Sequence, residues 1–236
     1  MATSTIRHGA RYSDAIVDTL YRRIADECAH LARPALIIDP FAGTGEKIAE
    51  HHDFQRLTIN HRIEGIELEP AFIAADWVKQ GNALHLPYQT GEVDIVFTSP
   101  SYGNRFADRH TPKDGSARNS YTFWLRHNQG VPIDDQTVQL HVENTGRHRF
   151  GTDYQQLHQG CYQELYRVMR PGGLLLLNVS NFMRNNLEVD AVSWHRDTLT
   201  SLGFVVTGET EIETRRMRYG ANRRRPDSER LLIVRR

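Results

Sequence analysis

The 236-residue chain has little cysteine, no long apolar run and no excess of charge of either sign. Its two cysteines, Cys28 and Cys161, are too few for the disulfide framework of a small secreted domain, so we expect reduced thiols. No apolar stretch approaches the roughly 18 residues that span a bilayer, and the N-terminal segment lacks the apolar core of a secretory signal. These absences predict a cytoplasmic protein that has no membrane partner.

Patterns typical of metal sites and of phosphate-binding loops are also missing. The 12 histidines are scattered without a tight HxxxH spacing, and no CxxC pair occurs, so we expect no metal. No Gly-Lys-Ser/Thr sequence follows a glycine-rich turn, and no third glycine stands at the spacing of a dinucleotide fingerprint. A nucleotide ligand of this chain is therefore expected to lack a pyrophosphate.

Charge is balanced but unevenly distributed. Basic and acidic residues number 29 each, so the total charge neither favours nor excludes nucleic acid as a partner. Arginines are concentrated near the C-terminus, directly after a glutamate-rich segment at 209–213. Because such asymmetry can hide a basic face inside a neutral average, the arginines of 215–225 are candidates for contacts with phosphates. The alternative is a solvated charged surface.

The sequence does contain an alternation of strand and helix patterns. Helical spacing is present in 12–29, with Ser13 as its cap, and in 45–52, 71–79, 153–170 (ended by Pro-Gly-Gly at 171–173) and 190–202. Strand patterns occupy 35–39, 63–67, 93–98, 174–179, 204–206 and 231–234. This alternation predicts an α/β fold with a mostly parallel sheet and helices on both faces. The last two strands have no helix between them, so a hairpin with an antiparallel edge strand is expected.

We expect one domain over residues 1–236, with an insertion at 103–151. Helical and strand periodicity disappears in that stretch, which is polar and basic, and a gap of this length inside a domain usually has a function. The insertion follows a loop that we assign below to a substrate pocket, so it should overhang that pocket. Its aromatic residues are candidates for filling the space left by a flipped base or for packing within the insertion: Tyr121, Phe123 and Trp124.

The turn at 39–45, Asp-Pro-Phe-Ala-Gly-Thr-Gly, follows the first strand. Ligands of open parallel sheets lie beyond the carboxyl ends of the strands, and Gly43 and Gly45 would let the backbone approach one closely. Asp39 would place a carboxylate there that attracts an ammonium group and repels a pyrophosphate.

Two further positions suit a nucleoside. Glu67 ends the second strand, where its carboxylate can accept hydrogen bonds from both ribose hydroxyls. Asn82 and Ala83 follow in the next loop, within reach of an adenine edge. A nucleoside that bears an amino acid and no phosphate fits these groups, and S-adenosylmethionine is such a molecule.

Three segments resemble the serial motifs of S-adenosylmethionine-dependent DNA amino-methyltransferases: 39–45, Gly-Ile-Glu-Leu-Glu-Pro at 65–70, and Thr-Ser-Pro-Ser-Tyr at 98–102. The resemblance covers roughly 35–102, with a looser fit over 153–205. It implies a Rossmann-like methyltransferase fold with a seven-stranded sheet, S-adenosylmethionine as cofactor, and duplex DNA with a flipped base as partner. Site-specific DNA methylation of this kind is also part of restriction–modification systems.

The resemblance also implies a place for each part of the cofactor. The methionine part would lie on the turn at 39–45, including Phe41 and Ala42, and Tyr12 would close over that end. The ribose would lie on Glu67 and the adenine on Asn82, where the family more often has aspartate. The asparagine carbonyl can still accept a hydrogen bond from the adenine amine.

Ser99-Pro100-Ser101-Tyr102 resembles the family's substrate loop, except that Ser101 replaces a second proline. An exocyclic amine on a base is a poor nucleophile because its lone pair is delocalised into the ring. Hydrogen bonds from the amine to the Ser99 hydroxyl oxygen and the Pro100 carbonyl would localise that lone pair, and Tyr102 would stack on the base. Catalysis would then come mainly from positioning and polarisation.

Several substrates remain open from the sequence. Serine at position 99 favours cytosine N4, with adenine N6 possible, whereas cytosine C5 needs a nucleophilic thiol that this loop lacks. Cys161 falls on an apolar helical stripe and is expected in the core. The alternatives are an RNA guanine-amine or small-molecule methyltransferase, and a cofactor-binding protein that is catalytically silent.

Overall fold

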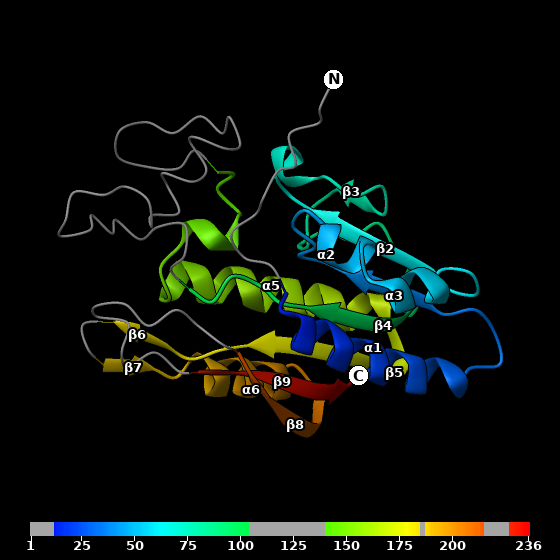
Figure 1. Cartoon of the computed structure of the whole chain (residues 1–236). Coiled ribbons are helices and arrows are strands. Elements are labelled where there is room, and N and C mark those ends of the chain that lie inside the picture. The colour runs from blue at the N-terminus through cyan, green and yellow to red at the C-terminus, as the bar shows by residue number, and fades with distance from the viewer. Residues whose placement is uncertain (1–11, 104–139, 185–186, 215–226) are drawn as a thin grey trace.

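The computed structural model describes residues 12–103, 140–184, 187–214 and 227–236. Within these residues seven strands form one sheet in the order β3-β2-β1-β4-β5-β9-β8 (Figure 1). Their bounds are Leu36–Asp39 for β1, Arg62–Glu67 for β2, Val78–Gln80 for β3, Val93–Thr98 for β4, Met169–Val179 for β5, Val205–Glu213 for β8 and Ser228–Arg235 for β9. A separate hairpin consists of β6 (Phe182–Arg184) and β7 (Leu187–Val189).

The sheet is parallel from β3 to β5 and antiparallel beyond it. Strand β9 is inserted between β5 and the edge strand β8, and it runs antiparallel to both of them. The sequence-based prediction of a mostly parallel seven-stranded sheet with an antiparallel edge pairing is therefore confirmed. As a result, the start of β9 lies beside the carboxyl end of β5, where Arg230 pairs with Val179.

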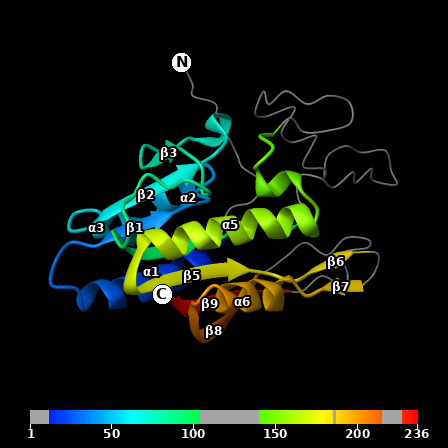
Figure 2. The same ribbon diagram turned by 180° about the vertical axis from the view of Figure 1, so that it is seen from behind.

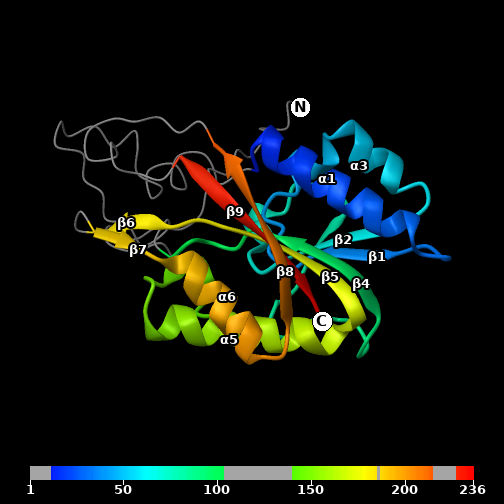
Figure 3. The ribbon, with the colours of Figure 1, turned by 90° about the horizontal axis from the view of Figure 1, so that it is seen from below.

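Helices cover both faces of the sheet, as predicted (Figures 2 and 3). One face carries α1 (Asp14–Ala29), α2 (Glu46–Ala49) and α3 (His52–Leu57), and the other carries α5 (Thr152–Val168) and α6 (Ala191–Ser201). Alternate residues of β1 enter the two cores: Ile37 packs against the α1 side and Ile38 against the α5 side. This sandwich buries the strands on both faces, which explains their nearly continuous apolar sequences.

Helix α1 begins as its sequence predicts. The Ser13 hydroxyl oxygen accepts a hydrogen bond from the Ile16 amide at 3.3 Å, which satisfies one of the unpaired donors at the helix start. The helix turns one apolar stripe toward the sheet: Ile16, Val17, Leu20, Ile24 and Cys28. None of the described helices is both long and apolar enough to cross a membrane.

The predicted helix at 71–79 is wrong. Residues Pro70–Phe72 form the short 3₁₀ helix η1, and Val78–Gln80 form edge strand β3. The Gly65 amide donates a hydrogen bond to the Trp77 carbonyl at 2.9 Å, so this segment completes the open edge of β2. Phe72, Ala75 and Val78 are all buried, and their three-residue spacing resembles that of a helix. The chain that carries them is instead a 3₁₀ turn followed by a loop and a strand.

Two other helix boundaries differ from the prediction. The helix expected at 45–52 is split into α2 and α3 by His51, whose backbone is extended. Helix α5 ends at Val168, and the Pro-Gly-Gly segment lies within β5, where pairing shifts register between Val93 and Ile95 of β4. Gly172 and Gly173 therefore lie in the irregular first part of β5, and they do not end the helix as the sequence predicts.

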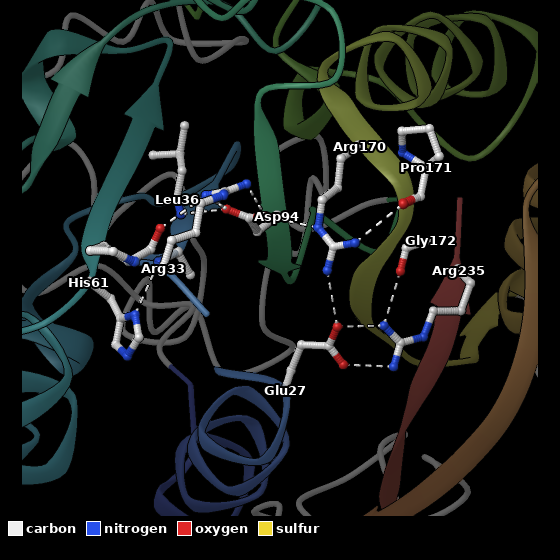
Figure 4. A network of polar contacts seen from close by, with 11 residues as sticks. Glu27, Arg33, Leu36, His61, Asp94, Arg170, Pro171, Gly172 and Arg235 are labelled. Atoms are coloured by element: carbon white, nitrogen blue, oxygen red, sulfur yellow. Dashed lines mark hydrogen bonds and ion pairs between the residues drawn. The ribbon is translucent and has the colours of Figure 1, made fainter. Parts of the chain in front are cut away.

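A polar network holds together the end of the sheet where β1 and β4 begin (Figure 4). The buried Asp94 carboxylate accepts hydrogen bonds from Arg33 at 2.9 Å, Arg170 at 2.8 Å and the Leu36 amide at 2.9 Å. Beside it, Glu27 of α1 pairs with Arg235 of β9 through two hydrogen bonds of 2.8 and 2.7 Å. These contacts fix the amino ends of the central strands, opposite the carboxyl ends from which the candidate site is built.

Candidate functional site

A cavity opens at the carboxyl ends of β1, β2 and β4, where polar turns follow buried strands. Ten of the eleven residues predicted for the site line it: Phe41, Ala42, Gly43, Gly45, Glu67, Asn82, Ala83, Ser99, Pro100 and Tyr102. The structure thus brings together segments that are far apart in the chain. Other segments complete the wall with residues that include Tyr12, Lys47, Phe72, Glu143, Thr145, Cys161, Asn178 and Glu229.

The two glycines of the turn serve different purposes. Both have left-handed backbones, with φ of +57° at Gly43 and +68° at Gly45. A Cβ atom at Gly43 would meet nothing within 4 Å, so a side chain there would enter the cavity. A Cβ atom at Gly45 would collide with Val78 Cγ2 and would lie 2.9 Å from Trp77 Nε1, so packing against Val78 and Trp77 requires the absence of a side chain at Gly45. The sequence predicts that both Gly43 and Gly45 allow a ligand to approach the backbone, and only Gly43 faces open space.

Glu67 is tied to the glycine turn. Its carboxylate accepts hydrogen bonds from the Gly43 amide at 3.0 Å and the Glu69 amide at 2.8 Å. Burial raises the pKa of Glu67 to about 7, although these backbone donors oppose the rise. A carboxylate has about four lone-pair directions, so two amide partners leave room for hydroxyl donors from a ligand.

Asp39 lies behind the cavity wall and not on it. Its carboxylate accepts hydrogen bonds from the Thr98 hydroxyl at 2.7 Å, the Phe41 amide at 3.0 Å and the Tyr12 hydroxyl at 3.0 Å. Burial raises its pKa to about 6. Asp39 therefore fixes the turn and orients Tyr12, which lines the cavity in its place. The sequence predicts the Asp39 carboxylate at the mouth of the site, and the structure instead buries it behind the wall.

The adenine end predicted from Asn82 includes a partner that the sequence did not reveal. The Asn82 side-chain oxygen accepts from the Leu84 amide at 2.9 Å, and its nitrogen donates to Glu143 at 2.7 Å. Glu143 belongs to the last part of the insertion, and Glu69 holds that part in place by accepting from the His141 amide and the Asn144 side chain at 2.8 Å each.

The substrate end is a cluster of hydroxyls, an amide and a carboxylate. The Tyr102 hydroxyl donates to Glu229 at 2.6 Å and lies 2.6 Å from the Ser99 hydroxyl. The Asn178 nitrogen donates to Tyr102 at 2.7 Å and to Glu229 at 2.5 Å. Asn178 is fully buried, and its Oδ1 has no hydrogen-bond partner in the part of the chain that the structure describes. Together these contacts form one hydrogen-bonded cluster around the Tyr102 hydroxyl.

A buried chain of hydrogen bonds through Tyr154, His195 and Tyr162 supports the loop that contains Ser99 and Ser101. The Tyr154 hydroxyl donates to the Ser101 carbonyl at 2.8 Å, so it must accept from His195 Nε2, 3.1 Å away. His195 Nδ1 then accepts from the Tyr162 hydroxyl at 2.7 Å, which fixes one tautomer. Burial lowers the pKa of His195 well below its usual value, so the ring stays neutral. This chain of hydrogen bonds ties α5 and α6 to the loop.

Some predicted features lie outside the described residues: the aromatics Tyr121, Phe123 and Trp124, and the arginines of 215–225. The described end of the insertion, from residue 140, does reach the cavity through Glu143, Asn144 and Thr145. Cys161 is buried, as expected, but it also lines the cavity. Among described residues, no group of three or more histidine, cysteine or acidic side chains could hold a metal ion.

Comparison with models of protein families finds no match, and comparison with curated proteins finds none either. Among solved structures, the [4+2]-cyclase SpnF aligns with a TM-score of 0.51 and 15% identity over 98% of this chain and 88% of that one. At this identity the likeness shows the fold alone. The chain has the Rossmann-like methyltransferase fold that its motifs imply.

Two other solved structures align slightly less well. A geranyl diphosphate methyltransferase in complex with GPP and sinefungin has a TM-score of 0.49 and 12% identity, over 93% of this chain and 79% of that one. A SAM-dependent methyltransferase from Methanosarcina mazei has a TM-score of 0.49 and 11% identity, over 88% of this chain and 95% of that one.

Proposed function

We propose that the protein is an S-adenosylmethionine-dependent methyltransferase that modifies the exocyclic amine of a DNA base. One observation supports this best: a single cavity is lined by the glycine turn with Glu67, by Asn82 at a second position, and by the Ser99 loop at a third. A methyl donor and its acceptor would therefore meet inside one cavity.

The residues that line the cavity suit the cofactor. The open space over Gly43 leaves room for a ligand against the backbone, and Glu67 retains acceptor capacity for ribose hydroxyls. Apolar residues also line the cavity, and Phe41, Phe72 and Ala83 among them suit a sulfonium compound and its adenine ring. When bound, S-adenosylmethionine supplies an electrophilic methyl group.

The residues around Ser99 suit activation of an amine. The Ser99 hydroxyl oxygen and the Pro100 carbonyl would accept the two amine hydrogens and localise the nitrogen lone pair. As the nitrogen gains a methyl group it must lose a proton, which can pass to Ser99 while the serine proton moves to Tyr102 and the tyrosine proton to Glu229. The distances of 2.6 Å along this chain of groups support such a transfer.

The choice of DNA rests on the sequence motifs, with cytosine N4 favoured over adenine N6. A small-molecule amine is the second candidate. SpnF shares the fold at a TM-score of 0.51 and is a cyclase, so this fold also supports other chemistry. An RNA guanine amine and a silent cofactor-binding role stay as alternatives that the following experiment separates.

The test is incubation of the purified protein and methyl-labelled S-adenosylmethionine with duplex DNA, tRNA or free nucleosides. Mass detection of N4-methylcytosine in DNA, absent with Ser99→Ala, is the expected result. Calorimetry with S-adenosylhomocysteine serves as the control, because Ser99→Ala should bind it normally. Label in tRNA or nucleosides alone would overturn the DNA assignment, and tight cofactor binding with no labelled product would indicate the silent role.

A further inference from the structure

The orientation of Asn82 is fixed by its neighbours. The backbone amide of Leu84 can only donate, so the Asn82 atom 2.9 Å from it must be the oxygen. The other atom must then be the nitrogen, which donates to the Glu143 carboxylate at 2.7 Å. The side-chain oxygen expected to receive the adenine amine thus has one of its two lone pairs occupied, and the nitrogen cannot accept.

Glu143 brings a carboxylate to the same part of the cavity. One of its oxygens receives the Asn82 hydrogen bond, and its other oxygen makes no hydrogen bond with the residues that the structure describes. The position is well defined, because the Glu69 carboxylate holds His141 and Asn144 on either side. Glu143 is partly exposed and lines the cavity, so a ligand can reach it.

We propose that Glu143, contributed by the insertion and oriented by Asn82, is the residue that selects the amine of the cofactor's adenine ring. The inference rests on the proposed function and names a residue of its cofactor site. The Glu143 carboxylate accepts a hydrogen bond from the amine and repels a ring carbonyl in its place. It supplies a negative charge beside the neutral Asn82 amide.

The same segment also contacts the substrate loop. The Thr145 hydroxyl lies 3.0 Å from the Ser101 hydroxyl, only two residues from Glu143. A cofactor that engages Glu143 would therefore stabilise the segment that touches Ser101. Cofactor recognition and the placement of the substrate loop are linked through this stretch of chain.

Calorimetry on the full chain tests the proposal with two ligands. One is S-adenosylhomocysteine and the other is S-inosylhomocysteine, which carries a ring carbonyl where the first carries the amine. The unmodified protein should bind the adenosyl ligand at least about tenfold more tightly, or about 1.4 kcal/mol. Glu143→Gln should reduce this preference to about twofold or less, because its amide can also donate to a carbonyl.

Matched variants separate recognition from folding. Glu143→Ala should weaken binding of S-adenosylhomocysteine and leave binding of S-inosylhomocysteine unchanged. The double variant Asn82→Asp/Glu143→Gln should restore the preference for the adenosyl ligand, because it again places one carboxylate and one amide at these two positions. Glu50→Gln, an exposed glutamate outside the cavity wall, should change nothing. An unchanged preference in both Glu143 variants overturns this inference alone. An unmodified protein that binds neither ligand overturns it together with the proposed function.

Discussion

Tyr102 is held by its hydroxyl as well as by its ring. Tyr102 is 9% exposed and belongs to the core on the α5 side, and its hydroxyl contacts Ser99, Asn178 and Glu229. The sequence predicts only the ring's role, that of stacking on a base, and that prediction stays open. The hydroxyl contacts motivate the second role proposed above, the transfer of a proton to Glu229, which a conservative substitution can isolate.

We expect Tyr102→Phe to slow methyl transfer by about 100-fold, a typical contribution of proton transfer, and to leave S-adenosylhomocysteine affinity unchanged. The ring remains available for stacking, so the loss would report the hydroxyl. Single-turnover rates measure the effect. Tyr88→Phe is the matched control, since its buried hydroxyl also donates to a glutamate, Glu64 at 2.9 Å, but lies outside the cavity wall. An unchanged rate in Tyr102→Phe would remove the hydroxyl from the mechanism.

Cofactor affinity should increase with pH through the titration of Glu67. The pKa of this carboxyl is raised by burial to about 7, and hydroxyl donors from a bound ribose favour its ionised form. Affinity for S-adenosylhomocysteine should therefore rise between about pH 6 and pH 8. Glu67→Gln should bind more weakly and with a flatter profile. Calorimetry in buffers of matched ionic strength tests this, and equal slopes for both proteins would contradict it.

The same shift affects stability with the opposite sign. Because the folded pKa of about 7 lies above the usual glutamate value, the folded state retains a proton that the unfolded state releases. The carboxyl thus stabilises the fold at acidic pH, and this contribution is lost as pH rises toward 7. As the pH rises toward 7, the melting temperature of ligand-free Glu67→Gln should therefore fall less than that of the unmodified protein.

At the scale of elements, the glycine turn combines a ligand requirement with a packing requirement. Gly43 faces open space, whereas Gly45 faces Trp77, whose indole nitrogen also donates to the Gly45 carbonyl at 2.9 Å. The sequence shows two glycines in one turn and cannot distinguish them. The difference depends on β3, the strand that the sequence wrongly predicts as part of a helix.

Alanine substitutions should separate the two glycines. Gly43→Ala should weaken S-adenosylhomocysteine binding strongly and cost about 1–2 kcal/mol of stability from its left-handed backbone. Gly45→Ala should destabilise more, because its methyl group also collides with Trp77. Urea unfolding and calorimetry on both variants provide the measurements. The reverse pattern, with Gly45→Ala the more stable variant, would contradict this division.

The sequence was sufficient where local periodicity and burial agree. The α1 stripe and the β4 strand are recognisable because each buries a regular set of side chains, whereas the turn at 39–45 is recognisable from its glycines and its motif. Edge strand β3 was missed because only its pairing with β2 makes it a strand. Glu229 and Glu143 were missed because their position at the cavity depends on contacts with Tyr102 and Asn82, which lie far away in the sequence. A polar Asn178 within the apolar β5 was the one local signal that could have been noticed.

On the scale of the whole molecule, the two ends of the sheet have different tasks. The amino ends are stabilised by the network around Asp94, while the carboxyl ends bear the cavity. The polar groups at the amino ends pair with one another, whereas the polar groups at the carboxyl ends line a cavity that a ligand can enter. Stability and function should therefore respond to different substitutions.

Asp94→Ala should lower the free energy of unfolding by about 1–3 kcal/mol, because it leaves the buried Leu36 amide without its acceptor, whereas the more exposed Arg33 and Arg170 can be hydrated. Its folded fraction should bind S-adenosylhomocysteine normally, since Asp94 is distant from the cavity wall. Urea denaturation and calorimetry measure the two quantities. Asp26→Ala, at an exposed position of α1, is the control. A loss of affinity equal to the loss of stability would show that the two ends are not independent.

The insertion of β9 between β5 and β8 has a consequence for incomplete chains. The last strand closes the gap in the sheet and also places Glu229 behind Tyr102. A translation product that stops before Ser228 would lack both the strand and the carboxylate. Such a fragment would keep the glycine turn and Glu67 but lose the carboxylate to which Tyr102 donates, so on the proposed mechanism premature termination of synthesis would give an inactive product.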